Sequence, residues 1–192
     1  KEDIGDGYGR AIALTNVALI QTHLEQWEES GANLVEAGNT AEAVGATWLI
    51  PEIRRVAAQR ALALGDVAAA SNAALAALTA AEALGVPAHI GVAHRVLGAV
   101  EAARQGAAVA DEHFQTSLAV FEMLENDHEL AKTRAAYAEV LLKRGEADEA
   151  ANLIEAALTT FARSGAQGRA ERLQRLRSGS GPGPASTTGA GA

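Results

Sequence analysis

A spacing of 40 residues runs through the chain and constrains its fold more than any other feature. Four columns of residues recur at this spacing, three of them small and one mostly bulky. The small columns are Ala18, Ala58, Gly98 and Ala138; Ser30, Ala70, Ala110 and Ala150; and Ala37, Ala77, Ser117 and Ala157. The bulky column is Leu34, Ala74, Phe114 and Ile154. Repetition at a fixed period of about 20–50 residues is the signature of stacked supersecondary units, so the chain is predicted to be a repeat protein.

Each repeat is predicted to hold two helices. The second and third small columns are seven residues apart, which places them on one helix face, and turn residues such as Gly65-Asp66 and Gly145-Glu146 precede them. Aromatic residues make up only 4% of the chain while alanine is abundant, a composition that favours closely packed helices. First helices are expected near 9–24, 48–64, 88–104 and 128–144, second helices near 27–44, 67–84, 107–124 and 147–164, and a ninth helix near 168–177.

The predicted fold class is all-α: a right-handed α-solenoid of four 40-residue helix-turn-helix repeats with a C-terminal capping helix. The repeats are placed near 11–50, 51–90, 91–130 and 131–170, within a repeat domain of residues 10–178 whose cap spans 168–178. Residues 1–9 are interpreted as the end of a preceding repeat or a linker; their Gly-rich segment follows no strand, which argues against a phosphate loop. Residues 179–192, rich in Gly, Pro, Ser, Thr and Ala, are expected to be a disordered tail.

The order of the columns (small, turn, small, bulky, small) resembles the tetratricopeptide repeat. Leu97-Gly98, Ala110, Phe114 and the stretch 144–150 match that pattern best. The chain departs from it in two ways: the unit is longer, and Leu14, Arg54, His94 and Arg134 stand where a large aromatic residue is expected early in each first helix. Such long units are similar to the C-terminal sensor repeats of large bacterial signal-transduction ATPases and maltotriose-type transcription activators.

The resemblance implies a non-catalytic scaffold that binds a protein or peptide segment in a concave groove and is attached to further domains. The alternative that it implies is a region that senses a peptide or a small-molecule effector. Both readings use the same surface, and the sequence does not separate them.

Charge and composition argue against several other functions. The net charge of −8 disfavours direct nucleic-acid binding and attachment to an anionic membrane, because both need clustered cations. The chain has no cysteine, which excludes disulfides and thiolate chemistry and fits a cytoplasmic location. Neither a phosphate-binding G-x-x-x-x-G-K-[ST] motif nor H-E-x-x-H nor G-x-S-x-G occurs, so we expect no enzyme and no cofactor.

Individual polar and aromatic residues give little support for chemistry. His89 and His94 are five positions apart and do not share a helix face, which argues against a metal site. His113 is interpreted as part of a solvated face. Trp27 and Trp48 are interpreted as packing residues at a turn and at a repeat junction.

One asymmetry in charge suggests a binding surface. Cations concentrate on the first helices, which line the inner side of such stacks, while the second helices lean acidic. Arg54 and Arg55 recur in phase with His94 and Arg95 and then with Arg134. The candidate groove consists of Arg54, Arg55, Gln59, His94, Arg95, Lys132, Arg134 and Glu139.

We expect this set to recognise carboxylates or phosphates on an acidic partner segment, because guanidinium groups bind such oxygens in pairs. The alternative is that the arginines pair with Glu52, Glu101 and neighbouring carboxylates of the same chain. As surface residues, Arg55 and Arg95 would tolerate charge reversal with little change in stability while partner binding is lost.

Overall fold

A computed structural model describes residues 4–179 of the chain, with side chains from residue 6 onward. Within that range the regular structure is entirely helical, so the all-α prediction is confirmed. The elements are α1 (Ile4–His23), α2 (Trp27–Ala43), the 3-10 turn η1 (Thr47–Leu49), α3 (Ile50–Ala63), α4 (Val67–Leu84), α5 (Pro87–Ala103), α6 (Ala107–Met123), α7 (Asp127–Arg144), α8 (Ala147–Arg163) and α9 (Gln167–Arg177). The tail predicted from 180 onward lies outside the described residues, as do residues 1–3.

Most helix bounds fall within two or three residues of those predicted, but α1 begins earlier than expected. It starts at Ile4 rather than near residue 9, so the Gly-rich segment 5–9 is the first part of a helix and not a connection. Gly7 allows α1 to approach the end of α2 closely, because a Cβ there would collide with the side chain of Val44. The Tyr8 hydroxyl donates a hydrogen bond of 2.8 Å to the Val44 carbonyl and fixes this contact.

The helices end in a left-handed residue that recurs every 20 positions. Five of these residues are glycine, and the other three are Glu25, Gln105 and Glu125, with φ values of 59°, 64° and 51°. After most of these residues, the next N–H donates to the carbonyl five residues earlier, as Asp66 does to Ala61 at 2.9 Å and Asn126 to Phe121 at 3.0 Å. This is the Schellman arrangement, which satisfies the last carbonyls of each helix. Helix length in this chain is therefore set by a turn repeated twice per 40 residues.

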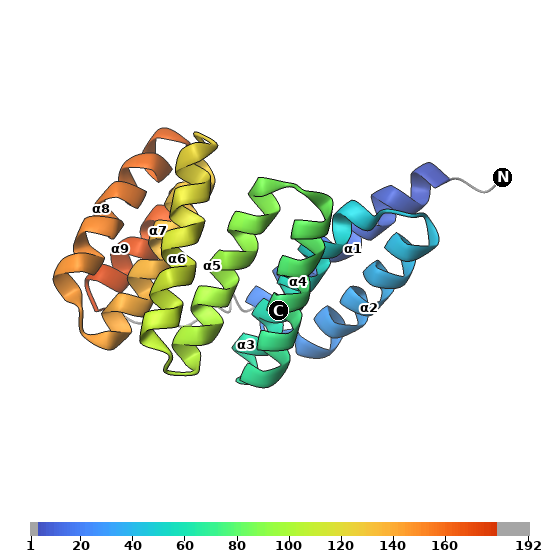
Figure 1. The fold of residues 1–192 in the computed structure, drawn as a ribbon, viewed down its shortest axis with the longest axis horizontal. Helices are drawn as coiled ribbons and strands as arrows, with labels where there is room; N and C mark the ends of the chain where they lie inside the picture. Colours follow the sequence, from blue (N-terminus) through green and yellow to red (C-terminus); the bar gives the residue numbers. More distant parts are fainter. Residues whose placement is uncertain (1–3, 180–192) are drawn as a thin grey trace, which may run out of the picture.

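Helices that follow one another in sequence pack in pairs, and the pairs follow one another along the long axis of the molecule (Figure 1). We call α1, α3, α5, α7 and α9 the first helices and α2, α4, α6 and α8 the second helices. Each second helix also packs on the next first helix, and the first helices α1, α3, α5 and α7 contact their neighbours directly. The first helices thus form one continuous layer.

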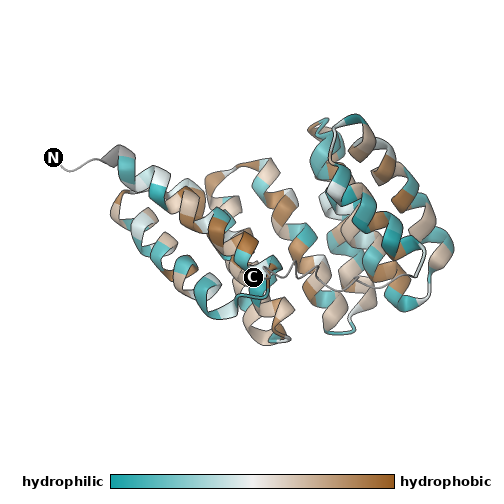
Figure 2. Ribbon diagram, turned by 180° about the vertical axis from the view of Figure 1, so that it is seen from behind, coloured by the Kyte–Doolittle hydropathy of each residue, from teal (hydrophilic) through white to brown (hydrophobic). Residues whose placement is uncertain are grey.

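The small columns are buried where the helices approach most closely. Ala18, Ala58 and Ala138 have no exposed surface, and Gly98 is buried against Phe114. The Phe114 ring stacks on Tyr137 with centroids 4.8 Å apart, which joins α6 to α7. Hydrophobic and hydrophilic residues are interspersed along the helices (Figure 2), as expected for helices with one covered side. Trp27 is half-buried, but Trp48 is 45% exposed, so its predicted packing role is wrong.

One described helix, α4, is long and apolar enough to cross a membrane by length and composition alone. Its buried residues Ala70, Ala74, Ala77 and Ala81 form a stripe in the helix stack. Such a helix is equally typical of a protein core, so it carries no argument for a membrane.

Candidate functional site

The layer of first helices is bent, which brings its two ends together. His23 at the end of α1 and residues 165–169 with Arg172, at the start of α9, line one open cavity of about 610 Å³. Charged side chains from every first helix lie within electrostatic reach of one another on this side. We call it the inner face; its charged and polar residues are His23, Glu52, Arg55, Gln59, Arg95, Glu129, Lys132, Glu139, Arg169 and Arg172.

On α3, the inner face holds a group of three residues spaced one helical turn apart. Arg55 is only 9% exposed and forms an ion pair with Glu52, its Nε lying 2.8 Å from Oε2. Its Nη1 donates to Gln59 Oε1 at 2.7 Å. Burial opposes ionisation of Glu52, but the hydrogen bond and charge of Arg55 outweigh it and lower the pKa of this carboxyl below its ordinary value.

A second group joins α5 to α7. Arg95 is 8% exposed, and its Nη1 lies 2.7 Å from Oε2 of Glu129. Lys132 approaches the other carboxylate oxygen of Glu129 at 2.6 Å. Burial alone would raise the pKa of Glu129, but Arg95 and Lys132 lower it to about 2. Burial lowers the pKa of both Arg95 and Lys132, and the shared Glu129 carboxylate stabilises their charged forms against this effect.

The end of the inner face at α9 is cationic and exposed. Arg172 donates to both oxygens of Glu139, at 3.0 and 3.2 Å, and so links α9 to α7. Arg169 is exposed and has no carboxylate within ion-pair distance in the described part of the chain. Burial, followed by the charges of Arg172 and Arg169, lowers the pKa of His23. The cavity therefore gathers positive charge without full internal neutralisation.

The predicted groove residues separate into two sets. Arg55, Gln59, Arg95, Lys132 and Glu139 lie on the inner face. His94 and Arg134 point instead toward α6: His94 Nδ1 is 2.9 Å from Nδ1 of His113, and Arg134 is 3.6 Å from Glu122. Arg54 is exposed and forms no ion pair among residues 4–179. Adjacent helix residues point about 100° apart, so Arg54 does not share the inner face with Arg55.

Burial of Arg55 and Arg95 corrects the expectation that both are surface residues whose charge could be reversed at little cost. Their carboxylate partners come from the same chain, as the alternative reading proposed for Glu52; Glu101 pairs with Arg104 at 3.1 Å. His113 is half-buried beside His94, not on a solvated face. Sequence reasoning missed Glu129, Arg169, Arg172 and His23. The signal for the first three was present, since 129 and 132 recur in phase at 169 and 172.

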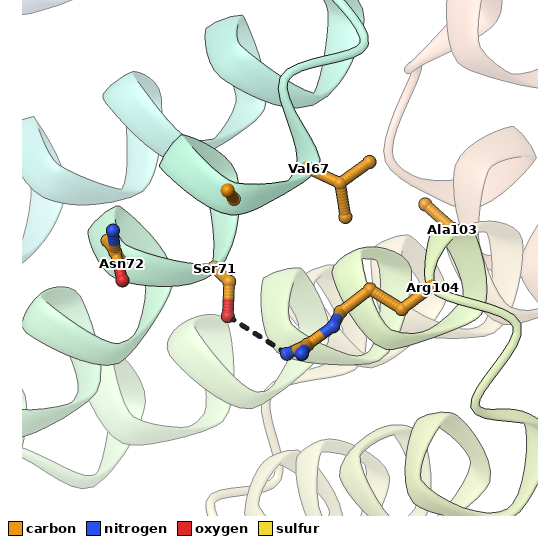
Figure 3. A pocket seen from close by; sticks show the side chains of 6 residues that line it. Val67, Ser71, Asn72, Ala103 and Arg104 are labelled. Carbon is orange, nitrogen blue, oxygen red and sulfur yellow. Dashed lines mark hydrogen bonds between the residues drawn. The ribbon is translucent and has the colours of Figure 1, made fainter.

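A separate contact recurs at the junctions between pairs. An arginine near the end of a first helix reaches the start of the preceding second helix: Arg60 Nε donates to the Trp27 carbonyl at 2.9 Å, and Arg144 Nη1 to Asp111 at 2.8 Å. At the α4–α5 junction, Arg104 Nη1 lies 3.4 Å from Ser71 Oγ in an open cavity of about 550 Å³ (Figure 3). Val67 and Ala103 also line this cavity, and Arg104 is the charged residue in its wall.

Among the described residues, no group of three or more His, Cys, Asp or Glu side chains is placed to hold a metal ion. No protein-family model and no curated protein matches the chain. The inner face therefore has to be interpreted from its own chemistry.

Proposed function

We propose that the chain is a right-handed α-solenoid of the tetratricopeptide kind that serves as a non-catalytic scaffold and binds a partner segment on its inner face. The continuous layer of first helices carries this proposal, because a layer with charged side chains along one side offers an extended surface for another chain. The repeat domain would be part of a larger bacterial regulatory protein and would act in the cytoplasm.

The charges of the inner face indicate an acidic partner. Arg55 and Arg95 are occupied by Glu52 and Glu129, so they hold the first helices in place and leave recognition to other groups. Arg169 and Arg172 are exposed cations that line the cavity, Arg172 beside its partner Glu139, and His23 completes the wall in its neutral form. Guanidinium groups that are exposed on the wall of a cavity attract carboxylates from a bound segment.

The cavity also supports the second candidate function, sensing of a small anionic effector. Its volume of about 610 Å³ lies within the range of about 300–1,000 Å³ that is typical of ligand pockets. Because the cavity joins the two ends of the bent layer, an anion bound there would favour the bent form over a more open one.

The experiment compares binding of a fluorescent oligoglutamate peptide and of citrate to the protein and to two variants. We expect the peptide to bind in a salt-dependent manner, and Arg169→Glu to weaken binding roughly tenfold because it reverses a cation of the cavity. Arg175→Glu is the matched control: Arg175 is an exposed arginine of the same helix that does not line the cavity, so its reversal should have a smaller effect.

A thermal shift with citrate alone would favour the effector function, since a ligand that prefers the native state raises its stability. Binding of oligoglutamate that is equally reduced by both variants would show that net charge, and not the inner face, governs the interaction. Absence of binding by both probes would contradict an acidic partner.

A further inference from the structure

The side of α1 that faces away from α2 carries an exposed apolar stripe. Val17 is 43% exposed, Ile20 57% and Leu24 62%. Residues three and four positions apart lie on one helix face, so these three side chains form one line with Ala13, which is also exposed. Scattered apolar surface residues need no explanation, but a continuous line on one helix face does.

Three of the four stripe positions are occupied by buried residues in α5 and α7, at distances that are multiples of 40 along the chain. Val17 corresponds to Leu97 and Tyr137, which are 1% and 3% exposed. Ile20 corresponds to Val100 and Val140, at 0% and 8%. Exposed Ala13 corresponds to Ile53, Ala93 and Thr133, at 5%, 2% and 0%. Three of the four stripe positions are therefore buried in both α5 and α7, whereas in α3 only Ile53 is buried, since Ala57 and Arg60 are half-buried and Leu64 is exposed.

What covers them is the preceding second helix. Leu97 and Val100 of α5 belong to one buried cluster with Ala70 and Ala74 of α4, and Leu78 packs against it. Arg104, at the end of α5, contacts Ser71 near the start of α4, so the two helices run antiparallel. The covering helix presents an apolar stripe at positions i, i+4 and i+8, small in the first two places and leucine in the third.

We propose that the exposed stripe of α1 binds a partner helix that runs antiparallel to it and presents the same kind of stripe as α4. Val17 and Ile20 are aliphatic like Leu97 and Val100, which favours a partner of the α4 type. The other second helices are matched to different residues. In α3, Arg60 stands at the position of Ile20 and bonds to α2, and in α7, Tyr137 stands at the position of Val17 and stacks on Phe114 of α6. Leu24 stands in phase with Arg104 and Arg144, so the partner needs an apolar residue where Ser71 and Asp111 receive those arginines. This surface is distinct from the inner face.

The test supplies such a helix in the correct phase. A copy of residues 47–86, which contains α3 and α4 and carries Ser71→Ala to face Leu24, replaces residues 1–6. Gly7 then directly follows the copied position 86, as Pro87 does in the chain. We expect the added residues to be helical, the melting temperature to rise, and the amide hydrogens of α1 to exchange at least about tenfold more slowly. Exchange is read by mass spectrometry on peptides from α1.

Ile20→Lys is the control variant, made in both the extended and the original chain. It should remove the added protection of α1 in the extended chain and leave the original chain almost unchanged, because Ile20 is exposed there. The proposal fails if the added residues stay unprotected or if α1 exchanges as before. It also fails if light scattering shows a dimer of the original chain that Ile20→Lys dissociates, since the occupant would then be a second copy.

Discussion

Gly98 is a residue whose lack of a side chain sets how closely α5 and α6 pack. A Cβ there would lie 2.8 Å from two carbons of the Phe114 ring, which is itself fully buried and stacked on Tyr137. The ring has no room to yield, so Gly98→Ala should cost about 1–3 kcal/mol in overpacking, against about 1 kcal/mol gained in helix propensity.

Gly38→Ala provides the opposite case, because Gly38 lies inside α2 and a Cβ there meets nothing within 4 Å. It should raise the free energy of unfolding by about 0.5–1 kcal/mol. Urea denaturation of both variants tests the pair. Equal stabilisation by both would show that α5 and α6 are not held as closely as Gly98 implies.

Glu129 makes stability depend on pH in the acid range. Its pKa is about 2 in the folded protein and ordinarily 4.5, so the folded state favours the ionised carboxylate. A depressed carboxyl pKa contributes stability above the unfolded value, and this contribution is lost as the pH falls from about 5 toward 2. The two pKa values limit the contribution of Glu129 to the free energy of unfolding to on the order of 3 kcal/mol.

Glu129→Gln should therefore flatten the fall in urea midpoint between pH 5 and pH 3. At pH 7 the variant should be less stable than the parent by about 3–5 kcal/mol, because buried Arg95 loses its carboxylate partner. An unchanged pH profile in the variant would assign the acid sensitivity to other carboxyls.

The turns between helices offer a test at the level of the element. Glu25, Gln105 and Glu125 hold left-handed conformations that cost L-residues about 1–2 kcal/mol. Replacing each by glycine should therefore stabilise the protein by roughly 0.5–1 kcal/mol, after allowing for the greater freedom of glycine in the unfolded chain. Gly65→Ala, at φ 77°, should have the reverse effect. Thermal unfolding of the four variants would contradict this explanation if all of them shifted the same way.

Helix positions could be predicted from the sequence because small columns and turns recur at a fixed phase. Even Glu125, which lies 40 residues from Gly85 and from Gly165, takes the left-handed turn that these glycines take. The start of α1 could not be predicted in this way. Gly-rich sequence normally disfavours helices, and here the close approach of Gly7 to Val44 and the Tyr8 hydrogen bond to the Val44 carbonyl hold this part of α1 against α2.

The inner face could be predicted only in part, since charge counts do not say which ions pair. The concentration of cations on first helices led to Arg55 and Arg95, which both lie on the inner face. Their burial depends on Glu52 and Glu129, and burial cannot be read from a single residue's type. Arg54 and His94 were included because they recur at the same 40-residue spacing as Arg55 and Arg95, although a helix turns adjacent residues to different sides.

At the scale of the whole molecule, large side chains are unevenly distributed along the stack. All three phenylalanines of the chain, with Tyr137 and Ile154, lie in the buried cluster formed by α6, α7, α8 and α9. The cluster of α1, α2 and α3 is built largely from alanine with a few aliphatic residues. In an array where each pair contacts mainly its neighbours, local stability follows local burial.

This uneven burial predicts that the chain does not open uniformly. In native-state hydrogen exchange, amides of α6–α8 should be protected by a larger opening free energy than those of α1 and α2, because they share the larger apolar core. Phe121, with no exposed surface, belongs to that core, and Phe121→Ala should cost about 3–5 kcal/mol there. The loss should appear in the exchange of α6–α8 while that of α1 and α2 stays nearly constant, since those helices do not contact the new cavity. If Phe121→Ala instead lowered protection equally in all the helices, the stack would unfold as one cooperative unit, and the quasi-linear architecture proposed for the array would be wrong.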